Sequence, residues 1–142
     1  MEKLNLPLKD ESLFGSPTTI NLEITELCNV KCTHCYNPWR DESMGSVSLD
    51  VEKMDRIIDE IKIANVFHVV LSGGEPMANF DILEHALTKL NGANISTSCN
   101  SNLMLATPDK VARLSEVGLD HILTSLPSMD PLTNDKIMNH IG

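Results

Sequence analysis

The sequence predicts an α/β fold built from parallel β/α units. Three strand-like runs begin near residues 66, 93 and 120, a spacing of 27 residues, and one helical pattern lies in the gap between each run and the next. Such an alternation is typical of a parallel sheet with right-handed crossover connections. One further strand-like run precedes them at residues 19–25. We therefore expect four parallel strands whose carboxyl ends meet at one edge of the sheet.

The first expected strand is preceded and followed by irregular segments. Residues 1–18 mix prolines, a glycine and charged side chains and indicate an irregular lead-in, so the domain itself is expected over 19–142. Residues 19–25 alternate polar and apolar side chains and are rich in β-branched residues, as a strand should be. Residues 26–48 form the longest expected loop and hold three cysteines. Loops of that length usually have a function.

The expected helices show apolar residues at three- and four-residue steps between recognisable start and stop signals. The N-cap candidates are Asp50 for the first helix, Asn79 or Asp81 for the second, and Thr107 for the third. Gly92 and Gly118 follow the second and third helices, where glycine commonly terminates a helix. Residues 133–142 resemble the opening of a fourth helix.

The later strands are expected at residues 66–71, 93–99 and 121–126. The run 66–71 is almost continuously apolar, which favours a strand covered on both faces. Ligands of parallel α/β sheets bind beyond the carboxyl ends of the strands. Four unusual segments follow those ends and are expected to form one composite site: the cysteine loop, Gly73–Pro76, Cys99–Asn102 and Ser125–Ser128.

Composition excludes several classes of protein. The 142 residues include 20 acidic and 11 basic side chains, and no two basic residues are adjacent, so nucleic acid is not expected as a partner. No apolar stretch reaches the 18 residues that a membrane helix needs. The N-terminus lacks a secretory pattern, so we expect a cytoplasmic protein. The cysteines of a cytoplasmic protein should stay reduced, which favours metal binding or catalysis over disulfides.

Three cysteines converge within eight residues. Cys28, Cys32 and Cys35 lie at positions i, i+4 and i+7 of a loop that can surround a compact inorganic centre. Thiolates are the ligands of iron–sulfur clusters, and three of them leave one iron of a four-iron cluster open. Two alternatives remain: a structural zinc site completed by His34 or Cys99, and cysteines that bind no metal.

The pattern Cys-x3-Cys-x2-Cys after the first strand, followed by Gly-Gly-Glu-Pro after the second, resembles the radical S-adenosylmethionine (SAM) superfamily. The resemblance implies a [4Fe-4S] cluster held by Cys28, Cys32 and Cys35, with SAM bound to the fourth iron. It further implies reductive cleavage of SAM to a 5′-deoxyadenosyl radical that abstracts a hydrogen atom from a substrate. An external electron donor such as flavodoxin or ferredoxin is implied as a partner.

The resemblance also implies which residues contact SAM. A carboxylate at Glu75 would accept a charge-assisted hydrogen bond from the SAM ammonium group. His34 stands where relatives often place a residue near the adenine, and the glycines of the turn allow a close approach to the ligand. The expected SAM-binding residues are Gly73, Gly74, Glu75, Pro76, His34, Asn100 and Ser125.

The Cys35–Tyr36 junction is common in the peptide-modifying, SPASM-type branch of this superfamily, although Tyr36 and Trp39 could simply pack the loop. We therefore expect hydrogen abstraction from a peptide in a maturation or natural-product pathway, with a small metabolite as the other substrate class. The alternative functions are a module that binds the cluster and SAM without turnover, or a zinc-binding structural protein.

Cores of this superfamily usually wrap six β/α units into a partial TIM-like barrel, and this sequence supplies the first four units. We therefore expect either that residues 19–142 are a truncated portion of a longer enzyme, or that a partner chain or a second copy covers the edge of the fourth strand. Cys99, within the third strand, is expected to be buried as a small hydrophobic residue.

Overall fold

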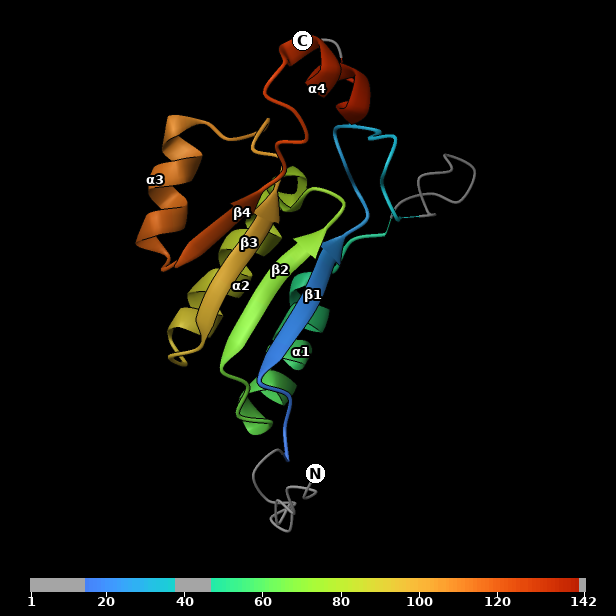
Figure 1. Ribbon diagram of the computed structural model, residues 1–142. Coiled ribbons are helices and arrows are strands. Elements are labelled where there is room, and N and C mark those ends of the chain that lie inside the picture. The colour runs from blue at the N-terminus through green and yellow to red at the C-terminus, as the bar shows by residue number, and fades with distance from the viewer. Residues whose placement is uncertain (1–14, 38–46, 141–142) are drawn as a thin grey trace, which may run out of the picture.

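The computed structural model describes residues 15–37 and 47–140 (Figure 1). Most of the lead-in expected over residues 1–18, and Trp39, lie outside these ranges. Strands and helices alternate along the chain. Their bounds are β1 Thr19–Thr25, α1 Val51–Ile63, β2 His68–Gly73, the 3-10 helix η4 Pro76–Asn79, α2 Phe80–Asn91, β3 Ser96–Ser101, α3 Pro108–Glu116, β4 His121–Thr124 and α4 Pro131–Met138.

The four strands form one parallel sheet in the order β1-β2-β3-β4, which confirms the predicted α/β fold. Helices α1 and α2 lie behind the sheet in Figure 1, α3 lies beside β4, and α4 lies beyond the carboxyl ends of the strands. Among the described residues β4 pairs only with β3, and Leu123 of β4 is 67% exposed. The strand edge expected to be uncovered is therefore uncovered here, and what covers it stays a prediction.

The hydrophobic core lies between the sheet and helices α1 and α2. Val69 and Leu71 of β2 point to the helices and are fully buried. On the other face of the strand, His68 and Val70 are only half-buried. The expectation that this strand is covered on both faces is therefore wrong for the described residues, because α1 and α2 pack on one face alone. The core residues of α1 and α2 are Met54, Ile58, Ile61, Ile82, Leu83, Ala86, Leu87 and Leu90.

Two strands begin later than expected, β2 at residue 68 instead of 66 and β3 at residue 96 instead of 93. In both cases an asparagine in the left-handed region follows the end of the preceding helix, Asn65 with a φ of 52° and Asn94 with a φ of 55°. The amide of the next residue returns to the helix, as the bond of 3.3 Å from Val66 N to Ile61 O shows. These helix-ending turns use residues that the apolar pattern had assigned to the strands.

The N-caps Asp50 and Thr107 are confirmed, since each side chain accepts a hydrogen bond from an amide of the first helical turn. Asn79 is the N-cap of α2 but makes no side-chain hydrogen bond there. The strand expected at 121–126 ends at residue 124. Helix α4 begins at residue 131 instead of 133, because Asp130 accepts a hydrogen bond of 2.9 Å from Thr133 N and caps it.

Asp120 connects the start of β4 to β3. Its Oδ2 accepts hydrogen bonds from Thr97 N at 2.8 Å and Ser96 Oγ at 3.0 Å, and these bonds lower the pKa of Asp120. A carboxyl group whose folded pKa is lowered adds stability above its unfolded pKa of about 3.9, and this stability is lost as the pH falls through the folded pKa.

We expect Asp120→Asn to lower the urea midpoint at pH 7, and the difference in midpoint from wild type to shrink below about pH 4. The exposed Asp109→Asn is the control, and a difference for Asp120→Asn that persists at low pH would contradict this account.

Among the residues that the structure describes, no helix has both the length and the apolar composition needed to cross a membrane.

Candidate functional site

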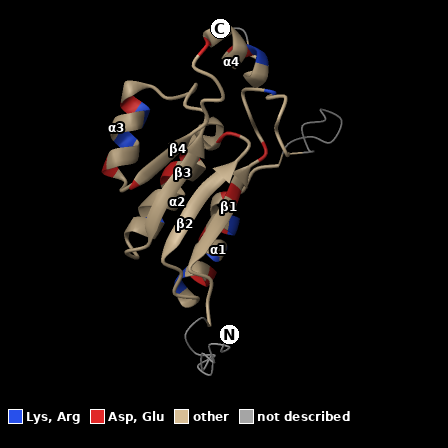
Figure 2. Ribbon diagram, in the orientation of Figure 1, with Lys and Arg blue, Asp and Glu red and all other residues tan. Residues whose placement is uncertain are grey.

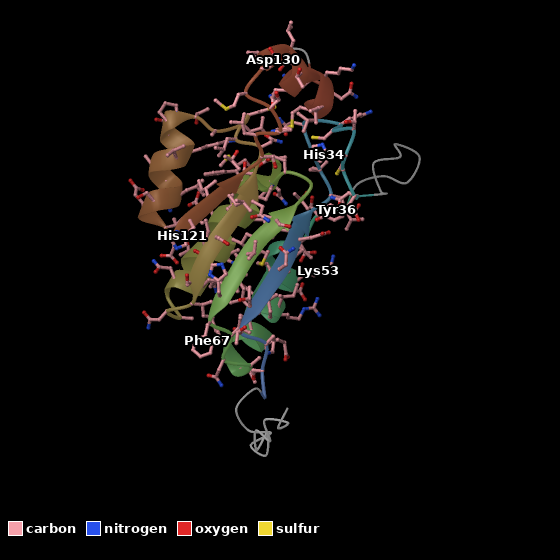
Figure 3. All side chains as sticks on the ribbon, viewed as in Figure 1. His34, Tyr36, Lys53, Phe67, His121 and Asp130 are labelled. Atoms are coloured by element: carbon pink, nitrogen blue, oxygen red, sulfur yellow. The ribbon has the colours of Figure 1, made fainter. Side chains whose placement is uncertain are left out.

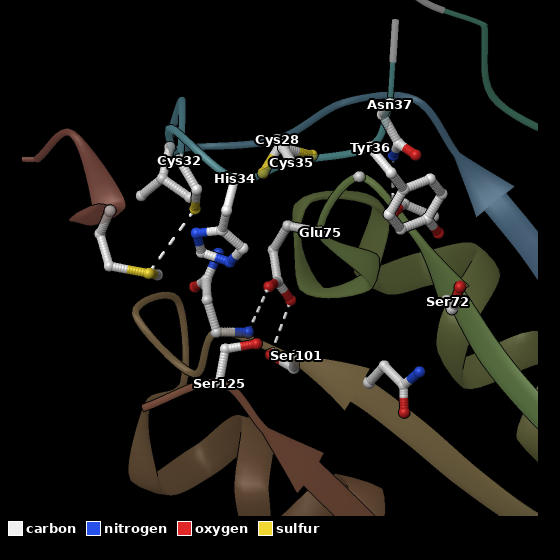
Figure 4. Close-up of a pocket in the computed structure, with 16 residues that line it drawn as sticks. Cys28, Cys32, His34, Cys35, Tyr36, Asn37, Ser72, Glu75, Ser101 and Ser125 are labelled. Carbon is white, nitrogen blue, oxygen red and sulfur yellow. Dashed lines mark hydrogen bonds between the residues drawn. The ribbon is translucent and has the colours of Figure 1, made fainter. Parts of the chain in front are cut away.

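A cavity of about 290 Å³ lies at the carboxyl ends of the strands (Figure 4). His34 and Tyr36 lie at this end of the molecule, and Phe67 lies toward the opposite end (Figure 3). Of the expected site residues, Pro76 does not line the cavity; it is buried as the first residue of η4. The expected residues that do line the cavity are Cys28, Cys32, His34, Cys35, Gly73, Gly74, Glu75, Asn100 and Ser125.

The Gly-Gly-Glu-Pro turn lies directly against the segment that leads into the cysteines. Gly74 N donates to Thr25 O at 2.7 Å, and Glu75 N donates to Leu27 O at 2.7 Å. A Cβ atom at Gly74 would collide with the carbonyl oxygen of Leu27. Gly73 has a φ of 140°, a conformation that favours glycine. The two glycines therefore allow a close approach, but in this structure the approach is to the chain's own backbone.

Glu75 is 1% exposed and is held by three donors. Its Oε1 accepts from Ser101 Oγ at 2.7 Å and from Met77 N at 3.0 Å. Its Oε2 accepts from Asn102 N at 2.8 Å (Figure 4). A carboxylate has about four lone-pair positions. Glu75 thus joins the end of β2 to the end of β3 and keeps about one position for a further donor.

The two residues after Cys35 hold the cysteine loop on the sheet. Tyr36 Oη donates to Glu23 Oε1 at 3.1 Å. Tyr36 is 71% exposed, and partial desolvation together with this hydrogen bond to Glu23 raises its pKa. Asn37 is 6% exposed, and its Nδ2 donates to Gly73 O at 3.3 Å. The loop is therefore tied both to β1 and to the glycine turn.

Several residues of the cavity have roles that the sequence did not predict, although Ser101 and Asn102 belong to the segment Cys99–Asn102 expected at the site. Ser101 and Asn102 hold Glu75, and the polar run that follows Asn100 is the signal that could have identified them. Met138, on α4, lines the cavity more than 100 positions after the cysteines. No local pattern predicts that contact. Cys99 is fully buried, which confirms its prediction, and burial raises its pKa to about 12.

Most of the positively charged side chains of the described residues lie away from the sheet. Apart from Lys31 on the cysteine loop, the described Lys and Arg residues lie on helices (Figure 2). Within residues 15–37 and 47–140, no group of three or more His, Cys, Asp or Glu side chains is arranged to hold a single metal ion. The three cysteines nevertheless line the same cavity.

Comparison with known proteins identifies the family. Residues 22–142 match the sequence model of the Radical SAM superfamily. The chain belongs to this superfamily. Membership implies SAM and an iron–sulfur cluster as cofactors.

This radical SAM protein is similar to longer proteins. It is 28% identical over 129 residues to a PqqA peptide cyclase of Rhodopseudomonas palustris, covering 91% of this chain and 34% of that protein. It is 32% identical over 123 residues to a probable GTP 3′,8-cyclase of Methanothermobacter thermautotrophicus, covering 84% of this chain and 38% of that protein. The chain thus spans about a third of the length of these relatives.

The fold of this radical SAM protein is similar to that of SuiB from Streptococcus suis. The structure of SuiB bound to its precursor peptide SuiA superposes with a TM-score of 0.74 at 24% identity, covering 89% of this chain and 28% of SuiB. The likeness confirms that the four strands and their helices form an α/β arrangement similar to the partial barrel of the superfamily.

Proposed function

We propose that this radical SAM protein holds a [4Fe-4S] cluster through Cys28, Cys32 and Cys35, binds SAM beside it, and abstracts a hydrogen atom from a peptide. The proposal rests on one observation: the three cysteines line the same cavity as Gly73, Gly74 and Glu75 of the glycine turn. Similarity to PqqA peptide cyclases, and to the fold of SuiB solved with a precursor peptide, supports a peptide as the substrate class.

The donor set fits an iron–sulfur cluster. Three thiols on one short loop supply the ligand type that these clusters need, and a three-thiolate set leaves one iron for SAM. The chemistry supplied there when both cofactors are bound is one-electron cleavage of SAM and hydrogen abstraction from the substrate.

The chain's own residues hold this site in position. The glycine turn keeps the entry to Cys28 against β2, and Tyr36 and Asn37 hold the exit from Cys35. Both ends of the cysteine loop are thereby attached to the sheet. We propose that His34 contacts the adenine, that Asn100 and Ser125 contact the ribose, and that the remaining lone pair of Glu75 accepts from the SAM ammonium group.

We further propose that an external donor such as flavodoxin or ferredoxin supplies the electron, because the reductive cleavage of SAM consumes one electron. A reducing compartment such as the cytoplasm suits reduced thiols and an oxygen-sensitive cluster.

Anaerobic reconstitution with iron and sulfide tests the cluster. We expect a reduced-cluster electron paramagnetic resonance signal that changes when SAM is added, and formation of 5′-deoxyadenosine under reducing conditions. Stoichiometric zinc without iron or sulfide would support the structural-protein alternative instead. SAM binding without 5′-deoxyadenosine would support a module that lacks turnover.

Replacing Cys32 by alanine is expected to reduce bound iron at least about tenfold, because two thiolates do not hold the cluster. Cys99→Ala is the matched control, since Cys99 is buried in the core and does not line the cavity. Iron and sulfide analysis after reconstitution measures the effect. Equal iron in Cys32→Ala and wild type would remove Cys32 from the ligand set.

A further inference from the structure

The last turn of α4 contacts the cysteine loop, although the two segments lie more than 100 residues apart in the sequence. Thr33 donates twice to the carbonyl oxygen of Ile137, from its amide at 2.8 Å and from its hydroxyl at 3.3 Å. The last carbonyl groups of a helix have no partner within the helix. The cysteine loop thus supplies donors to the end of α4.

Met138 makes the second contact between these segments. The Cys32 thiol donates to Met138 Sδ at 3.6 Å (Figure 4). Met138 is 4% exposed and is the one buried residue of α4, whereas Leu132 on the same helix is 80% exposed. This short helix therefore packs on the rest of the protein chiefly through the residue that contacts Cys32.

The conformation at the end of α4 is well defined. Asn139 takes the left-handed conformation with a φ of 50° and terminates the helix directly after Met138. The amide of His140 then returns to Asp135 O at 3.0 Å. The helix end that carries Met138 is thus closed by its own hydrogen bonds, so the Met138 backbone is held in place next to the loop.

Met138 also lines two cavities. It lines the cavity of the cysteines and a neighbouring cavity of about 240 Å³, and both include Asn102 and Ser125 in their walls. A thioether is apolar enough to exclude water and soft enough to pack against sulfur. The apolar shell of a metal site controls the access of solvent to the metal.

We propose that Met138 is a positioning residue of the iron–sulfur site: the end of α4 fixes the Cys32 side of the cysteine loop, and the thioether shields that sulfur and the bound cluster from water and oxygen. The shielding of the cluster rests on the proposed function. The packing of Met138 on Cys32 does not, so the two can be tested separately.

The first test uses the cluster-free protein. Anaerobic alkylation with iodoacetamide is followed at each cysteine by mass spectrometry in wild type, Met138→Ala and Met138→Leu. We expect Cys32 to react on the order of tenfold faster in Met138→Ala and at nearly the wild-type rate in Met138→Leu, which keeps the volume. Cys28 and Cys35 report any general loosening of the loop, and unfolding would expose the buried Cys99.

Met129→Ala is the matched control, because Met129 precedes α4 and is 87% exposed. It should leave all four alkylation rates unchanged. Equal Cys32 rates in wild type and Met138→Ala would overturn the proposal. If Met138→Ala exposes Cys99, Thr33→Val is used as the test variant instead. Thr33→Val removes only the 3.3 Å hydrogen bond from the Thr33 hydroxyl to Ile137 O. It should still raise the alkylation rate of Cys32 more than that of Cys28.

The second test uses the reconstituted protein. The visible absorption of the cluster is followed after exposure to air, and we expect it to decay several-fold faster in Met138→Ala, with Met138→Leu restoring the wild-type rate. Failure of the wild type to bind any cluster would refute the proposed function. The alkylation rates would still show whether Met138 packs on Cys32. Equal decay in all variants that do bind the cluster would refute the shielding role.

Discussion

Replacing Gly74 by alanine is expected to abolish cluster binding while most of the sheet remains folded. The added Cβ would collide with the carbonyl oxygen of Leu27 and lie 2.7 Å from that of Glu26. The turn cannot easily move away, because Gly74 N and Glu75 N both donate to this segment at 2.7 Å. The segment that leads into Cys28 must therefore shift, and overpacking of this kind costs about 1–3 kcal/mol.

Iron content after reconstitution and the urea unfolding curve measure the effect of Gly74→Ala. The control is Gly92→Ala, because a Cβ at Gly92 would meet its nearest atom at 3.5 Å, an ordinary contact, and Gly92 has a φ of −60°. Gly92→Ala should bind iron as wild type does. A Gly74→Ala protein with full iron content would show that the close approach of the two backbones is not what positions the cysteines.

Replacing Glu75 by glutamine is expected to destabilise the protein by about 3 kcal/mol even without cofactors, because hydrogen bonds to a buried charged group contribute about 1.5–3 kcal/mol each. The carboxylate accepts from Ser101 Oγ and from the amides of Met77 and Asn102. A glutamine side chain turns an NH2 group toward at least one of these donors. SAM affinity should fall as well, because Glu75 holds Ser101 and Asn102 in place and both residues line the cavity.

Urea denaturation of the cofactor-free protein and SAM titration of the reconstituted protein separate the two roles of Glu75. Glu60→Gln, on the exposed face of α1, is the control and should change neither value. If Glu75→Gln kept wild-type stability and lost only SAM affinity, Glu75 would be primarily a ligand of SAM. The three donors that already hold its carboxylate lead us to expect loss of both.

The starts of α1 and α3 were predictable because their signals are local. Asp50 and Thr107 each accept a hydrogen bond from an amide three residues later, at 2.8 Å and 3.3 Å. The strand starts were less predictable, since Asn65 and Asn94 reverse the chain after α1 and α2 and delay the strands by two or three residues. Apolar periodicity alone does not distinguish Val66 in a turn from Val66 in a strand.

The composite site was largely predictable because parallel strands end at one edge of a sheet. That rule brought His34, Asn100 and Ser125 to the cavity of the cysteines. It did not indicate that Glu75 is held by Ser101 and Asn102, because those bonds depend on how the ends of β2 and β3 are placed relative to each other. It also did not reveal which segment faces Cys32.

The sequence by itself determined the parallel β/α order, the cysteine loop and the glycine turn, because period, spacing and turn chemistry are properties of neighbouring residues. Only the tertiary structure decided that Gly74 is required by the backbone of Leu27, and that Met138 packs on Cys32. Both contacts join segments far apart in the chain. Whether such segments touch depends on the packing of the whole sheet and its helices, which no local pattern encodes.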